Sequence, residues 1–144
     1  MNDNKDEVIN GIKMIEKYNL NGEKLPTLLT PHDCEIVEVE CNDEFLIFKF
    51  ANNISRYDSI KAYRPETSSL VIKYHLIDPE VITYIKRKDW TGYDLVDTKT
   101  IIKKHKKLEY LYQYISHYSL IIKLFEVNEI MLEIQCDYLE YEWL

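Results

Sequence analysis

The chain has very little glycine: Gly11, Gly22 and Gly92 are the only three among 144 residues. The phosphate-binding loops of P-loop enzymes and of dinucleotide-binding proteins need several glycines at fixed spacing, because bare backbone must approach the phosphates. No such motif can be written here. The sequence therefore excludes the commonest nucleotide-binding motifs, although not nucleotide binding by other means.

Cysteines and long apolar runs are also scarce. Cys34, Cys41 and Cys136 are an odd number and form no CxxC pair, which argues against a disulfide framework. No apolar run approaches the roughly 20 residues of a transmembrane helix, and the polar, acidic first residues do not resemble a secretory signal. We therefore expect a cytoplasmic protein with free thiols and no membrane partner.

The remaining composition is ordinary for one globular domain. The chain is 46% hydrophobic and 30% charged, which argues against disorder, and its length suits a single core spanning residues 1–144. Tyrosine is abundant, with 12 residues beside two tryptophans. Because Tyr, Trp and Arg dominate interface hot spots, this surplus favours protein binding.

Charge is unevenly distributed along the chain. The formal net charge is −7, yet residues 86–107 hold eight Lys or Arg against three Asp, a local charge of +5 that leaves −12 elsewhere. An acidic body disfavours general nucleic-acid affinity and favours basic partners. The basic segment 86–107 nevertheless keeps a nucleic-acid hypothesis open.

The C-terminal segment 118–144 has the longest apolar alternation, and a period of two predicts two antiparallel strands. A three-residue loop at 127–129 would place Leu124 opposite Leu132 and Lys123 opposite Glu133. A helix from residue 127 onward is the competing interpretation. The phase of the alternation changes after residue 138, where the large residues become Leu139, Tyr141 and Trp143. A bulge would explain this change; otherwise these three form a second core or an exposed patch for a partner.

The other elements are predicted from periodicity, turn residues and helix caps. We expect a helix at 3–18, a packed connector at 23–33, a hairpin at 35–51 turning at 42–43, a weaker strand pair at 56–64 and 69–77, a helix at 79–88, a loop at 89–97 and a long helix from 97 or 98 to 117. In the hairpin at 35–51, Val39 would lie opposite Leu46. The result is an α+β fold, mainly an antiparallel sheet of about six strands with helices packed on one face.

The predicted long helix supplies candidate binding residues. Its outer face would carry Lys103, Lys107, Tyr110 and Tyr114, cations interleaved with aromatics. Such a set suits phosphates and bases, or a protein partner. Together with Leu139, Tyr141 and Trp143, they are the candidate partner-binding residues.

Catalytic and metal-binding motifs are weak. His32 and Cys34 lie two residues apart in an extended segment, so their side chains point in parallel and the thiol lacks the histidine contact that a nucleophile needs. A metal site drawn from these two with Cys41 and His75 matches no usual zinc spacing. We expect no catalytic residue, metal or cofactor, and the sequence favours a protein that is not an enzyme.

Three functional hypotheses follow. The first is a small acidic cytosolic protein-binding module with a basic partner, and a homodimer stays open. In general character it resembles bacterial immunity proteins and antitoxins, a likeness of composition that covers no motif. The second is a nucleic-acid-binding regulator that uses residues 86–107. The third is a small-molecule-binding protein or enzyme with a pocket between sheet and helices, using His75 or His105.

Overall fold

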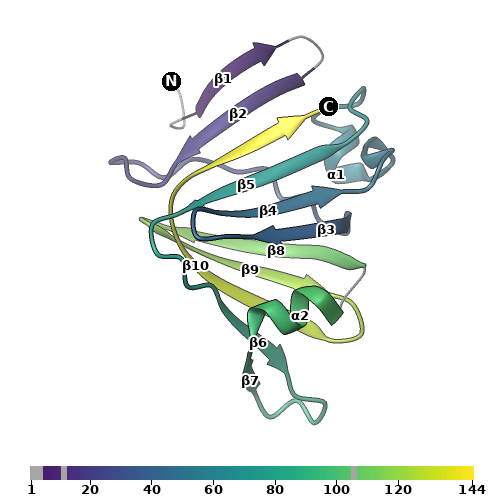
Figure 1. Ribbon diagram of the computed structural model, residues 1–144. Coiled ribbons are helices and arrows are strands. Elements are labelled where there is room, and N and C mark those ends of the chain that lie inside the picture. The colour runs from purple at the N-terminus through teal and green to yellow at the C-terminus, as the bar shows by residue number, and fades with distance from the viewer. Residues whose placement is uncertain (1–4, 11–12, 105–106) are drawn as a thin grey trace.

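The computed structural model describes residues 5–10, 13–104 and 107–144. Ten strands of this part of the chain join in one antiparallel sheet (Figure 1). In chain order they are β1 (Lys5–Asn10), β2 (Lys13–Asn19), β3 (Glu35–Cys41), β4 (Phe45–Phe50), β5 (Leu70–Leu76), β6 (Ile82–Lys86), β7 (Tyr93–Val96), β8 (Leu108–Ser116), β9 (Ser119–Phe125) and β10 (Glu129–Trp143). The helical elements of the same residues are short: η1 (Ile54–Arg56), α1 (Asp58–Lys61) and α2 (Thr98–Lys104).

Strand β10 closes the sheet on itself. Its N-terminal half pairs with β9 and β6, and its C-terminal half pairs with β5 and β2. The path β10–β5–β4–β3–β8–β9 therefore returns to β10 and forms a cylinder of six strands. The β1–β2 and β6–β7 hairpins extend the sheet beyond this cylinder, from opposite edges of β10 (Figure 1).

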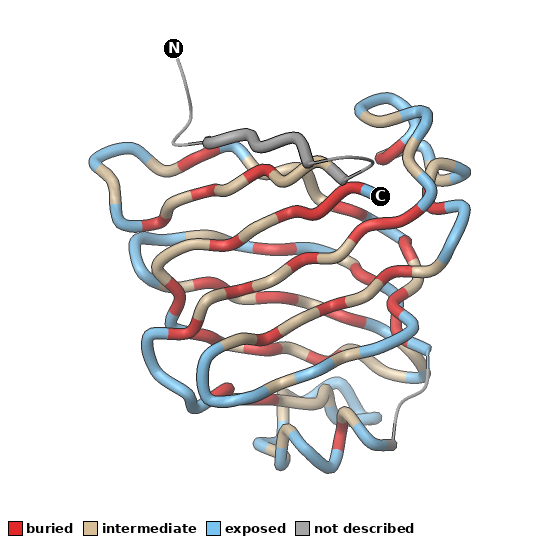
Figure 2. The backbone as a smooth tube through the Cα atoms, turned by 45° about the horizontal axis from the view of Figure 1, so that its top comes forward, coloured by how far each residue is buried: buried red, intermediate tan, exposed pale blue. Residues whose placement is uncertain are grey.

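The core fills the inside of the cylinder because alternate residues of each strand point inward. Strand β5 alternates buried and half-buried residues along its whole length, and Figure 2 shows the same alternation in its neighbours. The largest fully buried side chains are Tyr74, Tyr110, Tyr141 and Phe48. The Tyr74 and Tyr110 hydroxyls lie 3.4 Å apart, and Tyr141 donates a hydrogen bond of 2.6 Å to the carbonyl of Leu29. Buried tyrosines with satisfied hydroxyls account for part of the tyrosine surplus.

A bulge in β10 explains the change of phase after residue 138. Cys136 lies opposite Leu76 and Tyr138 lies opposite His75, so one extra residue, Asp137, stands between them. The extra residue transfers the inward direction from even-numbered to odd-numbered positions. The inward residues of the C-terminal half are Leu139, Tyr141 and Trp143, which are 0%, 0% and 3% exposed. These side chains belong to the core and form no exposed patch.

A buried carboxylate attaches β2 to the segment after α1. The side chain of Glu16 lies on the core side of β2 and is fully buried. It accepts hydrogen bonds from the hydroxyls of Tyr18 and Tyr63 at 3.1 and 2.6 Å, from Nη2 of Arg64 at 2.6 Å, and from Nε1 of Trp143 at 2.8 Å. Burial alone would raise its pKa, but the hydrogen bonds from Tyr63, Trp143 and Arg64 outweigh burial, and the pKa of Glu16 is lowered.

The predicted fold class is wrong, although a mainly antiparallel sheet is confirmed. Within residues 5–10, 13–104 and 107–144, ten strands replace the predicted six, and the helices are too few and too short to cover one face of a sheet. None of the helices among the described residues has the length and apolar character that crossing a membrane requires.

Three predicted helices are absent or shortened. Of the predicted helix at 3–18, the described residues 5–10 and 13–18 belong to the β1–β2 hairpin. The alternation of β2 is hard to see in the sequence because a polar residue, Glu16, takes an inward position. Residues 79–88 contain β6; Asp78 accepts the N–H of Glu80 at 2.9 Å, as a helix cap would, but a strand follows. The predicted loop at 89–97 contains β7, and the predicted strand at 56–64 is replaced by α1.

The predicted long helix ends at Lys104, and residues 108–116 form β8. The predicted start at residue 97 or 98 is confirmed, since α2 begins at Thr98 and Asp97 Oδ2 accepts the N–H of Thr100 at 3.0 Å. The register of β8 shifts between Tyr110 and Tyr112. This bulge places inward residues three positions apart, a spacing that resembles a helix.

Both predicted hairpins are present, with registers two positions away from the prediction. Leu124 lies opposite Ile130, not Leu132. Lys123 lies opposite Met131, and its ion pair is with Glu129 at 3.7 Å. In the first hairpin, Val39 lies opposite Phe48 and Leu46 opposite Cys41. The even shift leaves the side chains of the C-terminal hairpin on their predicted faces. In the first hairpin, a bulge between Ile36 and Glu38 buries Ile36 and leaves Val37 50% exposed.

Candidate protein-binding surface

Five neighbouring strands, in the order β8–β9–β10–β6–β7, present one continuous outward surface, called here the outer face. Residues that pair directly across antiparallel strands point to the same side. One outward row is Tyr112, Lys123, Met131, Tyr84 and Leu95. The adjacent row, Gln113, Ile122, Leu132, Thr83 and Val96, points into the core. Because Gln113, Ile122, Leu132 and Thr83 are all buried, the direction of the outward row is fixed.

The outer face is rich in exposed aromatic and aliphatic groups. Tyr112, Tyr114, Phe125 and Leu95 are 53%, 52%, 38% and 69% exposed. The rings of Tyr112 and Tyr114 stack with centroids 5.6 Å apart and planes at 18°. Lys123 Nζ lies 5.8 Å from the Tyr114 ring centroid. These contacts hold large side chains in place at the surface, where a partner can reach them.

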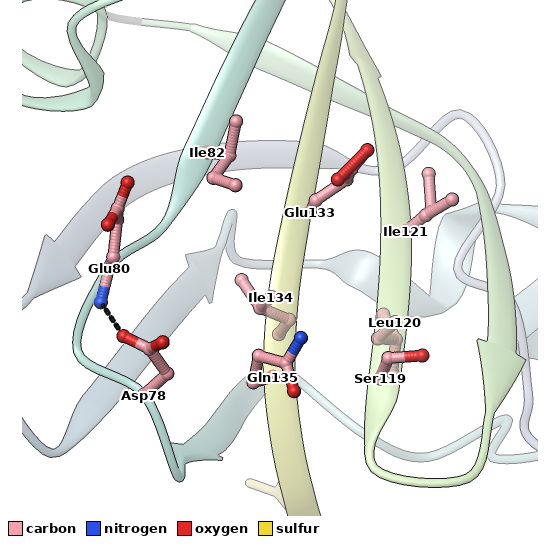
Figure 3. A pocket seen from close by; sticks show the side chains of 9 residues that line it. All are labelled: Asp78, Glu80, Ile82, Ser119, Leu120, Ile121, Glu133, Ile134 and Gln135. Atoms are coloured by element: carbon pink, nitrogen blue, oxygen red, sulfur yellow. Dashed lines mark hydrogen bonds between the residues drawn. The ribbon is translucent and has the colours of Figure 1, made fainter.

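One end of the outer face is an acidic notch of about 320 Å³. Its lining residues are Asp78, Glu80, Ile82, Ser119, Leu120, Ile121, Glu133, Ile134 and Gln135. Figure 3 shows Glu133 of β10 between Ile82 of β6 and Ile121 of β9. The notch therefore combines three carboxylates with aliphatic walls, a surface that suits the long aliphatic stem and cationic head of a basic side chain.

The other end is basic and lies at the tip of the β6–β7 hairpin, which carries Lys86, Arg87, Lys88 and Trp90. Trp90 is 74% exposed and has a φ of 65°, a left-handed conformation that bulky residues rarely adopt. Lys86 Nζ lies 4.2 Å from the Trp90 ring centroid, and Arg87 pairs with Asp94 at 2.8 Å.

Tyr93 connects the basic tip to β10. Its hydroxyl donates a hydrogen bond to Glu129. This bond, with a smaller effect of burial, raises the pKa of Tyr93 to about 12. Tyr93 therefore links the tip of the hairpin to the first residue of β10.

The outward surface of the other half of the sheet is different. Charged residues pair across strands there. Lys73 of β5 pairs with Glu142 of β10 at 2.9 Å, and Lys49 of β4 pairs with Glu40 of β3 at 3.2 Å. His75 stacks on Tyr138 with ring centroids 4.7 Å apart and binds Asp137 at 2.7 Å. Such cross-strand pairs are typical of a solvated face.

The structure separates the residues that sequence analysis placed on one helix face. Lys103 belongs to α2 and Lys107 precedes β8. Tyr110 is fully buried in the core, and Tyr114 is exposed on the outer face. Of the seven candidate partner-binding residues, four are therefore buried, because Leu139, Tyr141 and Trp143 join Tyr110 in the core.

Sequence analysis missed most of the outer face. Tyr112, Tyr84, Met131, Leu95 and Trp90 were not among the candidates. The alternation of Tyr112 and Tyr114 around Gln113 is a strand signal, but the longer helical pattern concealed it. Tyr84 and Leu95 lie on β6 and β7. These segments were predicted as a helix and a loop, so the two residues could not be placed on one sheet surface.

The structure does not place the imidazole of His32 against the thiol of Cys34. Burial is the main cause that raises the pKa of Cys34 to about 11. His32 turns away from this thiol and places Nδ1 2.7 Å from the carbonyl of Leu111. Among the described residues, no group of three His, Cys, Asp or Glu side chains is arranged to hold a metal ion.

The space between sheet and helices is only partly filled, because a pocket of about 560 Å³ lies among Cys41 of β3, the β6–β7 hairpin and the first residues of α2. Ile101 of α2 packs into the core with 8% exposure, and the void among its neighbours is about 10 Å³, the volume of roughly one water molecule. Of the two histidines named for a pocket, His75 lies on the outside of β5, and His105 lies outside the described residues.

Comparison with known proteins gives no relative: no protein-family model, no curated protein and no solved structure matches this chain.

Proposed function

We propose that this chain is a protein-binding module that docks on its partner with the outer face. The observation that carries the proposal is the row of outward residues across five strands, which includes the exposed Tyr112 and Leu95. Tyrosine offers a large contact area at a low cost in conformational entropy. The stacked Tyr112–Tyr114 pair lowers that cost further, because its rings are already held together.

Charge supports a partner with a basic patch. The chain carries a net charge of −7, and the notch places Asp78, Glu80 and Glu133 at the border of the apolar surface. Complementary charge raises association rates and selects partners. Small size, acidity and aromatic content agree with the resemblance to immunity proteins and antitoxins in general character.

Affinity capture with matched variants tests this proposal. The wild-type chain is used to capture proteins from host cells with and without nuclease, and the binding of each purified candidate is then titrated. The double variant Tyr112→Ser/Tyr114→Ser should weaken binding at least about tenfold. Val37→Ser is the control, because Val37 is 50% exposed on β3, outside the outer face. Equal binding by both variants would disprove the proposal.

Nucleic-acid binding is a second candidate because of the hairpin tip. Exposed Trp90 lies beside three cations, Lys86, Arg87 and Lys88, and aromatic stacking with phosphate contacts is how single strands are bound. The acidic body opposes this function. Loss of every captured component on nuclease treatment would favour it over the first candidate.

A further inference from the structure

Resting on the proposed function, we infer that the partner of the outer face is a second copy of this chain. The two ends of the face carry opposite charge. The acidic notch lies where β6 begins, at Ile82, and the basic tip lies where β6 ends, at Lys86. The face therefore offers a basic patch of the kind that its own notch would bind.

The positions of the acidic notch and the basic tip along β6 allow two copies of the outer face to fit each other. A two-fold axis that lies in the plane of contact and crosses the strands would reverse the direction of β6 in the second copy. Each basic tip would then lie over the notch of the other copy, giving two equivalent contacts. The central row, which includes Tyr84 and Met131, would lie on the axis and meet its own counterpart.

The side chains at the two ends suit each other chemically. The tip offers the exposed Trp90 ring with Lys86 Nζ 4.2 Å from its centroid. The notch offers Ile82 and Ile121 on either side of the carboxylate of Glu133. An indole ring can pack on isoleucines, while the ammonium group beside it approaches Glu80 and Glu133.

The size of the face sets the strength of the contact. The outer sides of β8, β9 and β10 curve around the cylinder, so two copies can meet over only part of the outer face. Standard stable interfaces use about 800 Å² per partner. The dimer is therefore weak, with a Kd on the order of micromolar, and added salt weakens it because exposed charges are screened.

Charge exchange between the two ends tests the inference. The tip variant is Lys86→Glu/Lys88→Glu, and the notch variant is Glu80→Lys/Glu133→Lys. Sedimentation velocity of each full chain is measured over a concentration series up to about 100 µM, well above a micromolar Kd. Wild type should be a dimer. Each variant alone should raise Kd at least about tenfold, since like charges then face each other.

The equimolar mixture of the two variants is the decisive sample. In a mixed dimer both tip–notch contacts unite opposite charges again, so the mixture should recover the wild-type Kd. Lys99→Glu/Lys103→Glu is the control, because both lysines belong to the basic segment 86–107 but lie on α2, outside the outer face. This variant should dimerise as wild type does. Circular dichroism verifies the fold, and the neutral variants Lys86→Gln/Lys88→Gln and Glu80→Gln/Glu133→Gln replace any chain that unfolds. The neutral variants should each weaken the dimer without complementing each other.

A wild-type monomer at about 100 µM would overturn the inference, and so would a dimer that neither charge variant weakens. Failure of the inference is separate from failure of the proposed function. If the wild type stays monomeric but binds another protein through Tyr112 and Tyr114, only the second-copy inference is wrong. If the dimer forms but neither Tyr112→Ser/Tyr114→Ser nor the charge variants weaken it, the outer face itself is not the binding surface.

Discussion

Arg64 places Nη2 2.6 Å from Oε2 of the fully buried Glu16 and so joins β2 to the segment after α1. The same carboxylate accepts hydrogen bonds from Tyr63 and Trp143. A buried acceptor of this kind is stabilising only while its donors are in place, because an uncompensated buried charge or donor is costly.

Neutralising this carboxylate should destabilise the fold. We expect Glu16→Gln to lower the free energy of unfolding by about 3 kcal/mol, since a neutral amide replaces the buried charge that Arg64, Tyr63 and Trp143 surround with donors. Urea unfolding at neutral pH measures the change. Glu140→Gln on the outward side of β10 is the control and should change stability by less than about 0.5 kcal/mol. An equal effect of both substitutions would contradict this role of Glu16.

The same pair predicts a pH dependence. The pKa of Glu16 is lowered in the folded state from an ordinary value of 4.5. Its ionised form therefore contributes stability that is present above pH 4.5 and is lost as pH falls through the lowered pKa. The difference in stability between wild type and Glu16→Gln should shrink below about pH 4. A difference that grows on acidification would be inconsistent with the lowered pKa.

Substitutions of one core leucine and one surface leucine should have different effects. Leu139 is 0% exposed and Leu95 is 69% exposed. Leu139→Ala should cost about 2–5 kcal/mol of stability by leaving a cavity. Leu95→Ala should leave stability within about 0.5 kcal/mol and weaken association. Thermal unfolding and sedimentation measure the two properties, and the reverse pattern would contradict the assignment of these residues.

The backbone conformation at Trp90 predicts how a substitution there changes stability and association. Its φ of 65° is a conformation that asparagine adopts more readily than tryptophan. Trp90→Asn should therefore leave the free energy of unfolding unchanged or raise it by up to about 1 kcal/mol. If Trp90 is displayed for binding, the same substitution weakens self-association. A destabilised variant with intact association would refute that role.

Thiol reactivity tests the core independently. Desolvation by burial raises the pKa of Cys34 to about 11 and that of Cys136 to about 12. Alkylation with iodoacetamide at pH 8, followed by mass spectrometry, should leave both unmodified in the native protein and modify them after denaturation, because the thiolate is the reactive form. Rapid native labelling of Cys34 would show that its segment is open.

Sequence alone predicted what depends on uninterrupted local alternation. The strands around Ile122 and Ile134, the strand at 69–77 that contains β5 and the start of a helix at residue 97 or 98 all follow from neighbouring residues. The change of phase after residue 138 was also visible in the sequence, and the bulge at Asp137 explains it.

What could not be predicted depends on tertiary contacts. Glu16 occupies a core position only because donors from a distant segment satisfy it. The bulge after Tyr110 gives β8 a helix-like spacing. The outer face combines β8, β6 and β7, which were predicted as helix, helix and loop, so no pattern within one segment could reveal that Tyr112, Tyr84 and Leu95 lie in one row.

Hydroxyl-radical footprinting of the bound protein tests the central claim most directly. Oxidation of individual side chains is compared between the associated and dissociated states, at concentrations above and below Kd. If the outer face is the binding surface, association protects Tyr112, Tyr114 and Trp90 and leaves Tyr57 and Tyr138, away from that face, unchanged. Protection that spares Tyr112 and Tyr114 and falls on Tyr138 would contradict the account.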